Sequence, residues 1–198
     1  MFIQIIQAKC TRQDEARAMA DRWIEEMAPM ADGWLGGTFG FTDDDMFVAV
    51  VRFESRELAM KNSDSAEQSA WWADFERCLD GPATFHNCDD VTLMMEGGSD
   101  KAGFVQIIRG KVDDAAQLKS MMTDTETLHE MRPDILGATL AIEPDGTFTE
   151  TVAFTSEDDA RRYEAESPMP AEMAQMMERN MHDVAYLDLH HPWFASKK

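Results

Sequence analysis

The sequence predicts an α+β fold built from two tandem copies of one βαββαβ unit of roughly 100 residues. Three observations support this prediction: an internal repeat, the same order of strand and helix patterns in both copies, and a short polar segment containing two glycines between them. The repeat opens with FIQIIQAK at residues 2–9, which aligns with FVQIIRGK at residues 104–111. Five of these eight positions are identical.

The alignment continues in the same order to the end of the unit, at an offset of 101 or 102 positions. LGGT at residues 35–38 matches LGAT at residues 136–139. Single identities follow: Val51 with Val152, Phe53 with Phe154, Ser55 with Ser156, Ala59 with Ala160, Glu76 with Glu178, and Arg77 with Arg179. Because the matches keep one order over the whole unit, they indicate a duplication.

Each copy begins with an apolar, β-rich strand at 2–9 or 104–111. A helix follows in the first copy, because apolar residues recur there at helical spacing: Ala16, Met19, Ala20, Trp23, Ile24 and Met27. Residues 34–41 and 46–53 then predict a hairpin around a polar turn. The second copy has Glu-Pro-Asp-Gly at the equivalent turn, a strong turn sequence because Pro presets φ and Gly tolerates positive φ.

A second helical region and a last strand complete each unit. We expect helical residues at 56–79 and 157–181, broken near residues 63–65 and at Pro168 and Pro170. The last strands are predicted at 84–95 and 183–190. The domain organisation predicted is a first unit at 1–96, a linker at 97–102, a second unit at 103–192, and a loosely held tail at 193–198.

Strand, helix, hairpin, helix and strand is the ferredoxin-like order. A unit of this kind covers one face of its sheet with helices and leaves the other face bare. We therefore expect the two copies to pack sheet against sheet within one chain.

Composition narrows the classes of partner. The net charge of −20, from 38 acidic and 18 basic residues, makes nucleic acid and anionic membranes poor partners. No apolar run is long enough to span a membrane, and the N-terminal apolar run lacks the basic region of a signal peptide. We therefore expect a cytoplasmic protein without a membrane segment. Cys10, Cys78 and Cys88 lack Cys-x-x-Cys spacing, which predicts reduced thiols.

Two groups of residues are candidates for ligand contacts. Trp71 and Trp72 form an aromatic cluster with Phe75 that could wall a flat apolar ligand, although helical spacing also suits plain core packing. Gln4 and Gln106 recur at one place on an apolar strand. A buried amide must be hydrogen-bonded, so each is either a structural tie or a ligand contact. Methionines replace the Trp cluster in the second copy: Met173, Met176, Met177 and Met181.

His86, Cys88 and Asp90 would alternate on one face of the last strand, a spacing that could hold a metal. The competing interpretation is an exposed strand with polar side chains, and we expect no metal site. Hydrolase, phosphate-loop and zinc-protease motifs are missing from the sequence, so no catalytic residue can be named. Gly36-Gly37 lies at the start of a strand and is typical of a bulge rather than a phosphate cradle.

The element order, the Leu-Gly-x-Thr segments and the corners at 53–55 and 154–156 resemble the antibiotic biosynthesis monooxygenase-like domains of the dimeric α+β barrel superfamily. The resemblance extends over nearly the whole chain, because each of the two copies matches one such domain. It implies that the fused copies mimic the homodimer that such domains form, as an intramolecular dimeric α+β barrel. It also implies a ligand pocket between each sheet and its helices.

The resemblance further implies a function. Heme-degrading members would need Asn, Trp and His where this sequence has Gln7, Lys61 and Trp71, respectively, and where the second copy has Arg109, Arg162 and Met173. We therefore expect no heme and no other cofactor. Cofactor-independent members that oxidise quinols surround an aromatic substrate with Asn, Trp and Tyr. The nearest equivalents here are Trp34, Asn62, Trp71 and Trp72.

The resulting hypothesis is a monooxygenase-like protein that acts without a cofactor on a small hydrophobic or aromatic compound. The alternative is a non-catalytic ligand-binding or structural member of the same fold. We expect a small-molecule ligand and a monomer that acts as a pseudo-dimer, or a weak homo-oligomer. The first copy is the better candidate, because it contains the Trp cluster.

Overall fold

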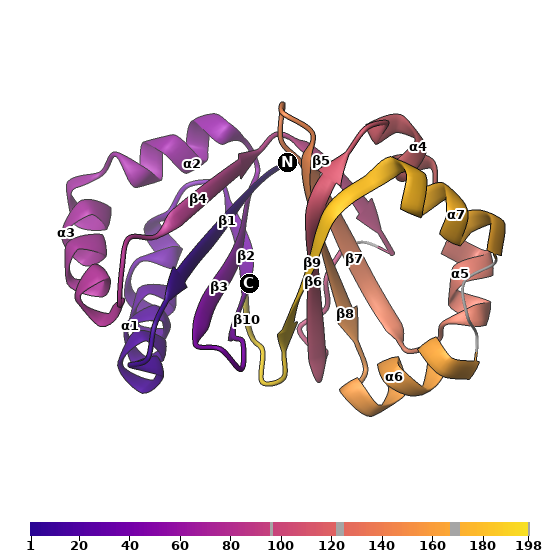
Figure 1. Ribbon diagram of the computed structural model, residues 1–198. Coiled ribbons are helices and arrows are strands. Elements are labelled where there is room, and N and C mark those ends of the chain that lie inside the picture. The colour runs from indigo at the N-terminus through magenta and orange to yellow at the C-terminus, as the bar shows by residue number, and fades with distance from the viewer. Residues whose placement is uncertain (96, 122–124, 167–170, 198) are drawn as a thin grey trace. The chain divides into compact units, whose positions relative to one another are not determined.

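The computed structural model describes residues 1–95, 97–121, 125–166 and 171–197, and it divides into two compact units. The first unit is Met1–Asp89 with Trp193–Lys198, and the second is Asp90–Pro192. Each unit is a five-stranded antiparallel sheet with helices along one face (Figure 1). The predicted tandem α+β fold is therefore confirmed.

The sheet of the first unit has the strand order β10-β2-β3-β1-β4. Its strands are β1 (Phe2–Lys9), β2 (Trp34–Phe41), β3 (Met46–Phe53), β4 (Thr84–Cys88) and β10 (Trp193–Ser196). Its helices are α1 (Gln13–Glu26), α2 (Arg56–Ser63) and α3 (Ala66–Phe75), with the short 3-10 turns η1 (Ala28–Met30) and η2 (Glu76–Cys78).

The second unit repeats this order as β5-β7-β8-β6-β9. Its strands are β5 (Asp90–Met94), β6 (Phe104–Val112), β7 (Ile135–Ile142), β8 (Thr147–Phe154) and β9 (Met181–Leu189). Its helices are α4 (Ala115–Met121), α5 (Thr125–Met131), α6 (Glu157–Glu166) and α7 (Ala171–Asn180). Across the described residues, no helix is long and apolar enough to cross a membrane.

The break between α2 and α3 is where the sequence predicts it. Ser55 caps α2 by accepting a hydrogen bond from the Leu58 backbone at 3.3 Å, and Ser65 caps α3 through the Gln68 backbone at 3.1 Å. A second capping serine makes a new helix begin after Asp64. The corresponding breaks at Pro168 and Pro170 lie outside the described residues.

Two sequence predictions about the edge strands are wrong. The strand predicted at 84–95 is interrupted at Asp89, so that β4 belongs to the first sheet and β5 to the second. The tail predicted to be loosely held instead forms β10, which pairs with β2 from Trp193 opposite Phe39 to Ser196 opposite Gly36. The physical reason is the same for both: β2 and β7 would otherwise leave a row of backbone groups unpaired at a sheet edge.

Gly36 explains how β10 fits against β2. The register shifts between Trp34 and Gly36, which confirms the predicted bulge, and Gly36 has a φ of +145°. A Cβ at this position would lie 2.5 Å from the backbone oxygen of Ala195 in β10. Glycine is therefore required by both the backbone angle and the close approach of the edge strand. Gly137 has the same role in the second unit.

The core of the first unit lies between its sheet and its helices. Residues alternate along β1, so that Phe2, Ile6 and Ala8 pack into the helix-facing core and Gln4 points the same way. Phe75 of α3 is 1% exposed in this core. The helix-facing side of β1 is therefore apolar except for the amide of Gln4, which marks the region of interest.

Candidate functional site

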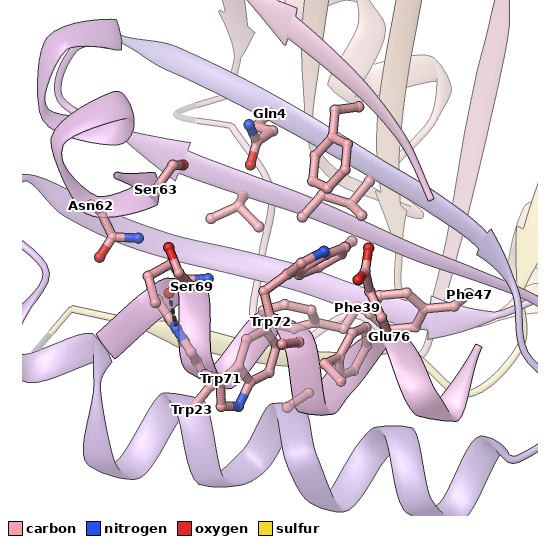
Figure 2. A pocket seen from close by; sticks show the side chains of 18 of the residues that line it. Gln4, Trp23, Phe39, Phe47, Asn62, Ser63, Ser69, Trp71, Trp72 and Glu76 are labelled. Atoms are coloured by element: carbon pink, nitrogen blue, oxygen red, sulfur yellow. Dashed lines mark hydrogen bonds between the residues drawn. The ribbon is translucent and has the colours of Figure 1, made fainter. Parts of the chain in front are cut away.

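A cavity of about 460 Å³ lies between the sheet and the helices of the first unit (Figure 2). The sheet side is formed by β1, β2 and β3, and the helix side mainly by α3 with parts of α1 and α2. Its lining residues are Gln4, Ile6, Ala20, Trp23, Phe39, Phe47, Ala49, Val51, Phe53, Asn62, Ser63, Gln68, Ser69, Trp71, Trp72, Ala73, Phe75, Glu76 and Phe85. This volume is in the range of small-molecule sites.

Aromatic rings make up much of the wall. Trp71 stacks on Phe75 with ring centroids 4.9 Å apart and an angle of 17°, and it meets Trp23 edge-on at 6.4 Å. Trp72 contacts Phe85 of β4 at 5.1 Å. Phe75 is buried core, whereas Trp71 and Trp72 are half-buried and line the cavity. Phe75 is therefore core packing, whereas Trp71 and Trp72 stand where a ligand in the cavity could contact them.

Gln68 is a hydrogen-bond donor with a fixed orientation. The indole Nε1 of Trp23 donates to Oε1 of Gln68 at 2.6 Å. Because an indole N–H can only donate, it fixes the amide oxygen of Gln68 toward Trp23. The amide nitrogen of Gln68 has no protein partner among the described residues, so it is available to a molecule in the cavity.

Gln4 is both a structural tie and a polar group of the cavity. Its Nε2 donates to Oδ1 of Asn87 in β4 at 2.9 Å, which joins β1 to the edge strand β4. Its Oε1 accepts no hydrogen bond from the described residues and remains available. Figure 2 shows Gln4 on the sheet side, with Asn62 and Ser63 approaching from α2.

The lining is almost free of charge. Glu76 of η2 is the one ionisable side chain among the lining residues that the structure describes, and it is exposed. No Lys, Arg or His side chain lines the cavity within the same described residues. The site can therefore offer hydrogen bonds and aromatic faces, but it has no cation with which to bind a carboxylate or phosphate.

Two predicted ligand residues lie elsewhere. Trp34 is 4% exposed and packs edge-on against Trp23 at 5.7 Å, so that it supports the wall without lining the cavity. Gln106 belongs to the second unit, where its Nε2 donates to Oδ1 of Asp188 at 2.8 Å. Gln4, Asn62, Trp71 and Trp72 are the predicted residues that the cavity brings together.

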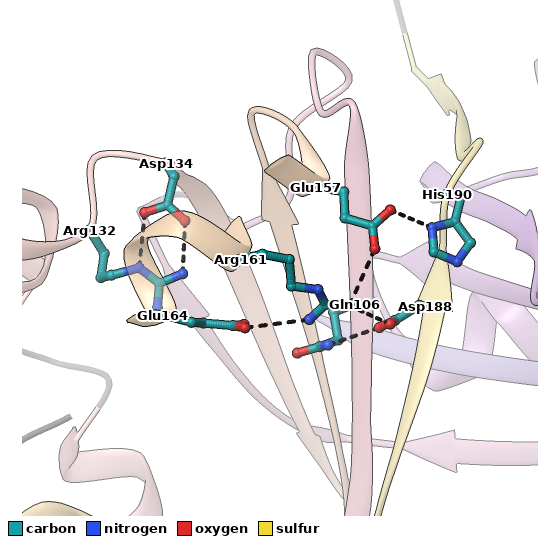
Figure 3. Close-up of polar contacts among 8 residues, drawn as sticks. All are labelled: Gln106, Arg132, Asp134, Glu157, Arg161, Glu164, Asp188 and His190. Carbon is teal, nitrogen blue, oxygen red and sulfur yellow. Dashed lines mark hydrogen bonds and ion pairs between the residues drawn. The ribbon is translucent and has the colours of Figure 1, made fainter. Parts of the chain in front are cut away.

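Ion pairs surround Gln106 in the second unit (Figure 3). Arg161 of α6 approaches Asp188 at 2.5 Å and also Glu157 at 3.5 Å, and Glu157 in turn contacts His190 at 2.6 Å. By the repeat offset, Arg161 stands where the first unit has Met60. The repeated glutamine is therefore hydrogen-bonded to a neutral amide, Asn87, in the first copy and to the carboxylate of Asp188 in the second.

Glu150 of β8 is a second difference between the copies, because it stands at the repeat position of Ala49 in the cavity wall. It lies between Phe148 and Val152 of the helix-facing core and has no hydrogen-bond or ion-pair partner among the described residues. Burial raises the pKa of Glu150 from 4.5 to about 7, because the carboxylate loses hydration without gaining a partner.

The three residues considered as metal ligands do not share one strand. His86 and Cys88 lie on β4, whereas Asp90 begins β5 of the other sheet, so that the three do not alternate on one strand. Within the described ranges, no group of three or more His, Cys, Asp or Glu side chains could hold a metal ion. Cys10, Cys78 and Cys88 are buried and form no disulfide within the described ranges. Burial raises the pKa of Cys10 and Cys78.

Sequence reasoning missed Gln68, Glu76 and Phe85. Gln68 lies three and four positions before Trp71 and Trp72, so helical spacing alone places it on their face of α3. Phe85 required knowledge that β4 lies next to β1, because only that pairing brings its ring to Trp72. No local pattern points to Glu76, although it is one of the residues shared by both copies.

Glu150→Gln should remove a dependence of stability on pH. The unfolded state loses the proton of Glu150 near pH 4.5 and the folded state near pH 7. The contribution of Glu150 to the free energy of unfolding therefore falls as pH rises between these values. Urea unfolding should show the variant more stable than the wild type by up to about 3 kcal/mol at pH 8, with little difference at pH 4. Glu130→Gln, an exposed change on α5, should show no such trend. Parallel pH curves for Glu150→Gln and the wild type would contradict the assignment.

Solved structures resemble the chain, although no protein-family model matches the sequence and no curated protein matches it. A putative monooxygenase from Lactobacillus acidophilus NCFM superposes with a TM-score of 0.74 at 11% identity, over 98% of this chain and 95% of that one. An anthrone oxidase-like protein gives 0.67 at 9% identity, over 98% and 92%. A ferredoxin fold protein related to antibiotic biosynthesis monooxygenases, from Listeria monocytogenes 4b F2365, gives 0.56 at 10% identity, over 96% and 94%. The chain therefore has the tandem α+β fold of these monooxygenase-related proteins.

Proposed function

We propose that the first unit binds an uncharged aromatic compound in its cavity and promotes the reaction of that compound with dioxygen without a cofactor. The observation that carries the proposal is the lining itself: Trp and Phe rings combined with neutral amides, and no basic side chain among the described lining residues. Flat rings pack well against such walls, because aromatic groups favour stacked and edge-on contacts.

Charge selects against anions at this site. A buried carboxylate or sulfonate without a cationic partner costs several kcal/mol, since it loses its hydration and gains no ion pair. Glu76 at the cavity and the net charge of −20 add to this repulsion. An uncharged compound with one oxygen acceptor fits better, because the free amide nitrogen of Gln68 can donate to it.

A suitable reaction is the oxidation of a methylene group activated by an adjacent aromatic ketone system. Removal of one proton gives an enolate, which dioxygen oxidises; overall, R₂CH₂ and O₂ give R₂C=O and H₂O. The cavity would contribute an apolar environment and hydrogen bonds from Gln68 and Asn62 to the developing enolate oxygen. Support from known proteins is limited to the shared fold, one example of which is described as anthrone oxidase-like.

The alternative is a binding protein that does no chemistry. It is favoured by one observation: the described lining residues include only one ionisable group, the exposed Glu76, to act as an acid or base. Both proposals require the same ligand class and differ only in turnover.

Trp72→Ala should weaken binding of an uncharged aromatic probe with little loss of fold stability, because Trp72 is half-buried in the cavity wall.

N-phenylnaphthylamine, a neutral fluorescent probe, should bind at least about tenfold more tightly than anilinonaphthalene sulfonate, its anionic analogue. Fluorescence titration measures both. As a control, Phe75→Ala should lower the free energy of unfolding by about 3–5 kcal/mol, as expected for buried core. Equal affinity for the two probes would refute the charge argument.

Incubation with anthrone separates the two proposals. An oxygenase should consume one dioxygen per anthrone and form anthraquinone and water, faster than the spontaneous reaction, as followed by an oxygen electrode and by absorbance. Gln68→Leu should slow turnover by roughly 10-fold to 100-fold if its amide stabilises the enolate oxygen. Probe binding without any rate above background would establish the non-catalytic alternative.

A further inference from the structure

We propose that Trp193 of β10 is a positioning residue for the cavity of the first unit: it holds the rings of Phe39 and Phe47 in the wall. This inference rests on the proposed function in one respect, that the cavity binds an aromatic compound. It goes beyond the proposed function because ligand binding would then depend on Trp193, which does not itself line the cavity.

The contacts of Trp193 place it directly behind the wall. Its ring stacks on Phe39 with centroids 5.6 Å apart and an angle of 22°, and it lies 6.4 Å from the ring of Phe47. It also meets Phe41 at 5.6 Å. Phe39 and Phe47 line the cavity, whereas Phe41 does not. The indole is 8% exposed, so that it fills space that would otherwise open behind these two rings.

The backbone of β2 is adapted to this arrangement. Gly36 admits the close approach of Ala195 in β10, the strand that carries Trp193. The ring of Phe39 lies over Gly37, where a Cβ would be 2.5 Å from the ring edge. Gly37 therefore allows the ring position that Trp193 supports. Both glycines therefore help to form the same cavity wall. Gly36 lets β10 approach β2, and Gly37 lets the ring of Phe39 lie over the backbone.

The second unit shows that the fold does not require this ring stack. There the edge strand β5 pairs with β7 in the equivalent register, and Thr92 stands opposite Leu140 where the first unit has Trp193 opposite Phe39. The position of Gly37 is taken by Ala138. A sheet of the same topology thus forms with a small polar residue in place of Trp193. The indole is an addition specific to the unit that has the aromatic cavity.

The hydrogen bonding of Trp193 supports the same conclusion. Its Nε1 is buried without a partner among the described residues. An unpaired buried donor disfavours folding, so that stability alone would favour Phe at this position. Arg17 of α1 lies over the indole ring at 4.7 Å, which connects the first helix to the last strand through the same side chain.

The test is a comparison of three variants in the full-length chain, with N-phenylnaphthylamine as the probe. Trp193→Ala should weaken probe binding by about tenfold or more, because Phe39 and Phe47 lose their support. Trp193→Phe should bind within about threefold of the wild type, because a ring still stacks on Phe39. Thr92→Ala, the matched change in the second unit, should leave the affinity unchanged.

The readouts separate positioning from stability. Binding is measured at a temperature where circular dichroism shows every variant to be folded, and Trp193→Leu takes the place of Trp193→Ala if the latter fails to fold. Leucine fills part of the space but cannot stack, so the loss of affinity should persist with it. Wild-type affinity in the Ala or Leu variant, or an equal loss in Thr92→Ala, would overturn the positioning role. A wild-type protein that does not bind the probe would instead refute the proposed function itself.

Discussion

Large rings in contact across two layers keep the helices of the first unit apart from its sheet. Phe47 of β3 meets Phe75 of α3 at 5.4 Å, and Trp34 of β2 meets Trp23 of α1 at 5.7 Å. Between these contacts the helix-facing side of β3 has only Ala49 and Val51, which are too small to fill the gap that the rings create. The cavity follows from this arrangement, because close-packed rings cannot collapse into it without breaking their own contacts.

The duplication has kept the backbone and changed the interior. Both sheets have the same order and the same glycine bulge, and both have a glutamine that ties β1 or β6 to the neighbouring edge strand. The interiors differ where a ligand would lie. The first has amides and indoles, whereas the second has Glu150 in its core face and ion pairs around Arg161. A change of this kind lets one copy retain a site while the other diverges.

The repeat allowed the fold to be predicted from the sequence, because the opening strand, the Leu-Gly-x-Thr segment and a polar hairpin turn recur in both copies. The edge strands could not be predicted, since local pattern does not show which sheet a short segment joins; residues 84–95 have one continuous strand pattern yet β4 and β5 lie in different sheets. For the cavity, helical spacing indicated Trp71 and Trp72. The same spacing places Gln68 on that helix face, but only its bond to Trp23 shows how its amide is oriented. Phe85 and Trp193 depend on pairings between segments far apart in sequence.

The two units differ most in whether they hold an aromatic site, which we place in the first unit alone. Calorimetric titration with N-phenylnaphthylamine measures this when the wild type is compared with Ala49→Phe, a change that places a ring inside the cavity. We expect one bound molecule per chain in the wild type and no binding in the folded variant. Two bound molecules per chain, or unchanged binding in Ala49→Phe, would contradict this placement.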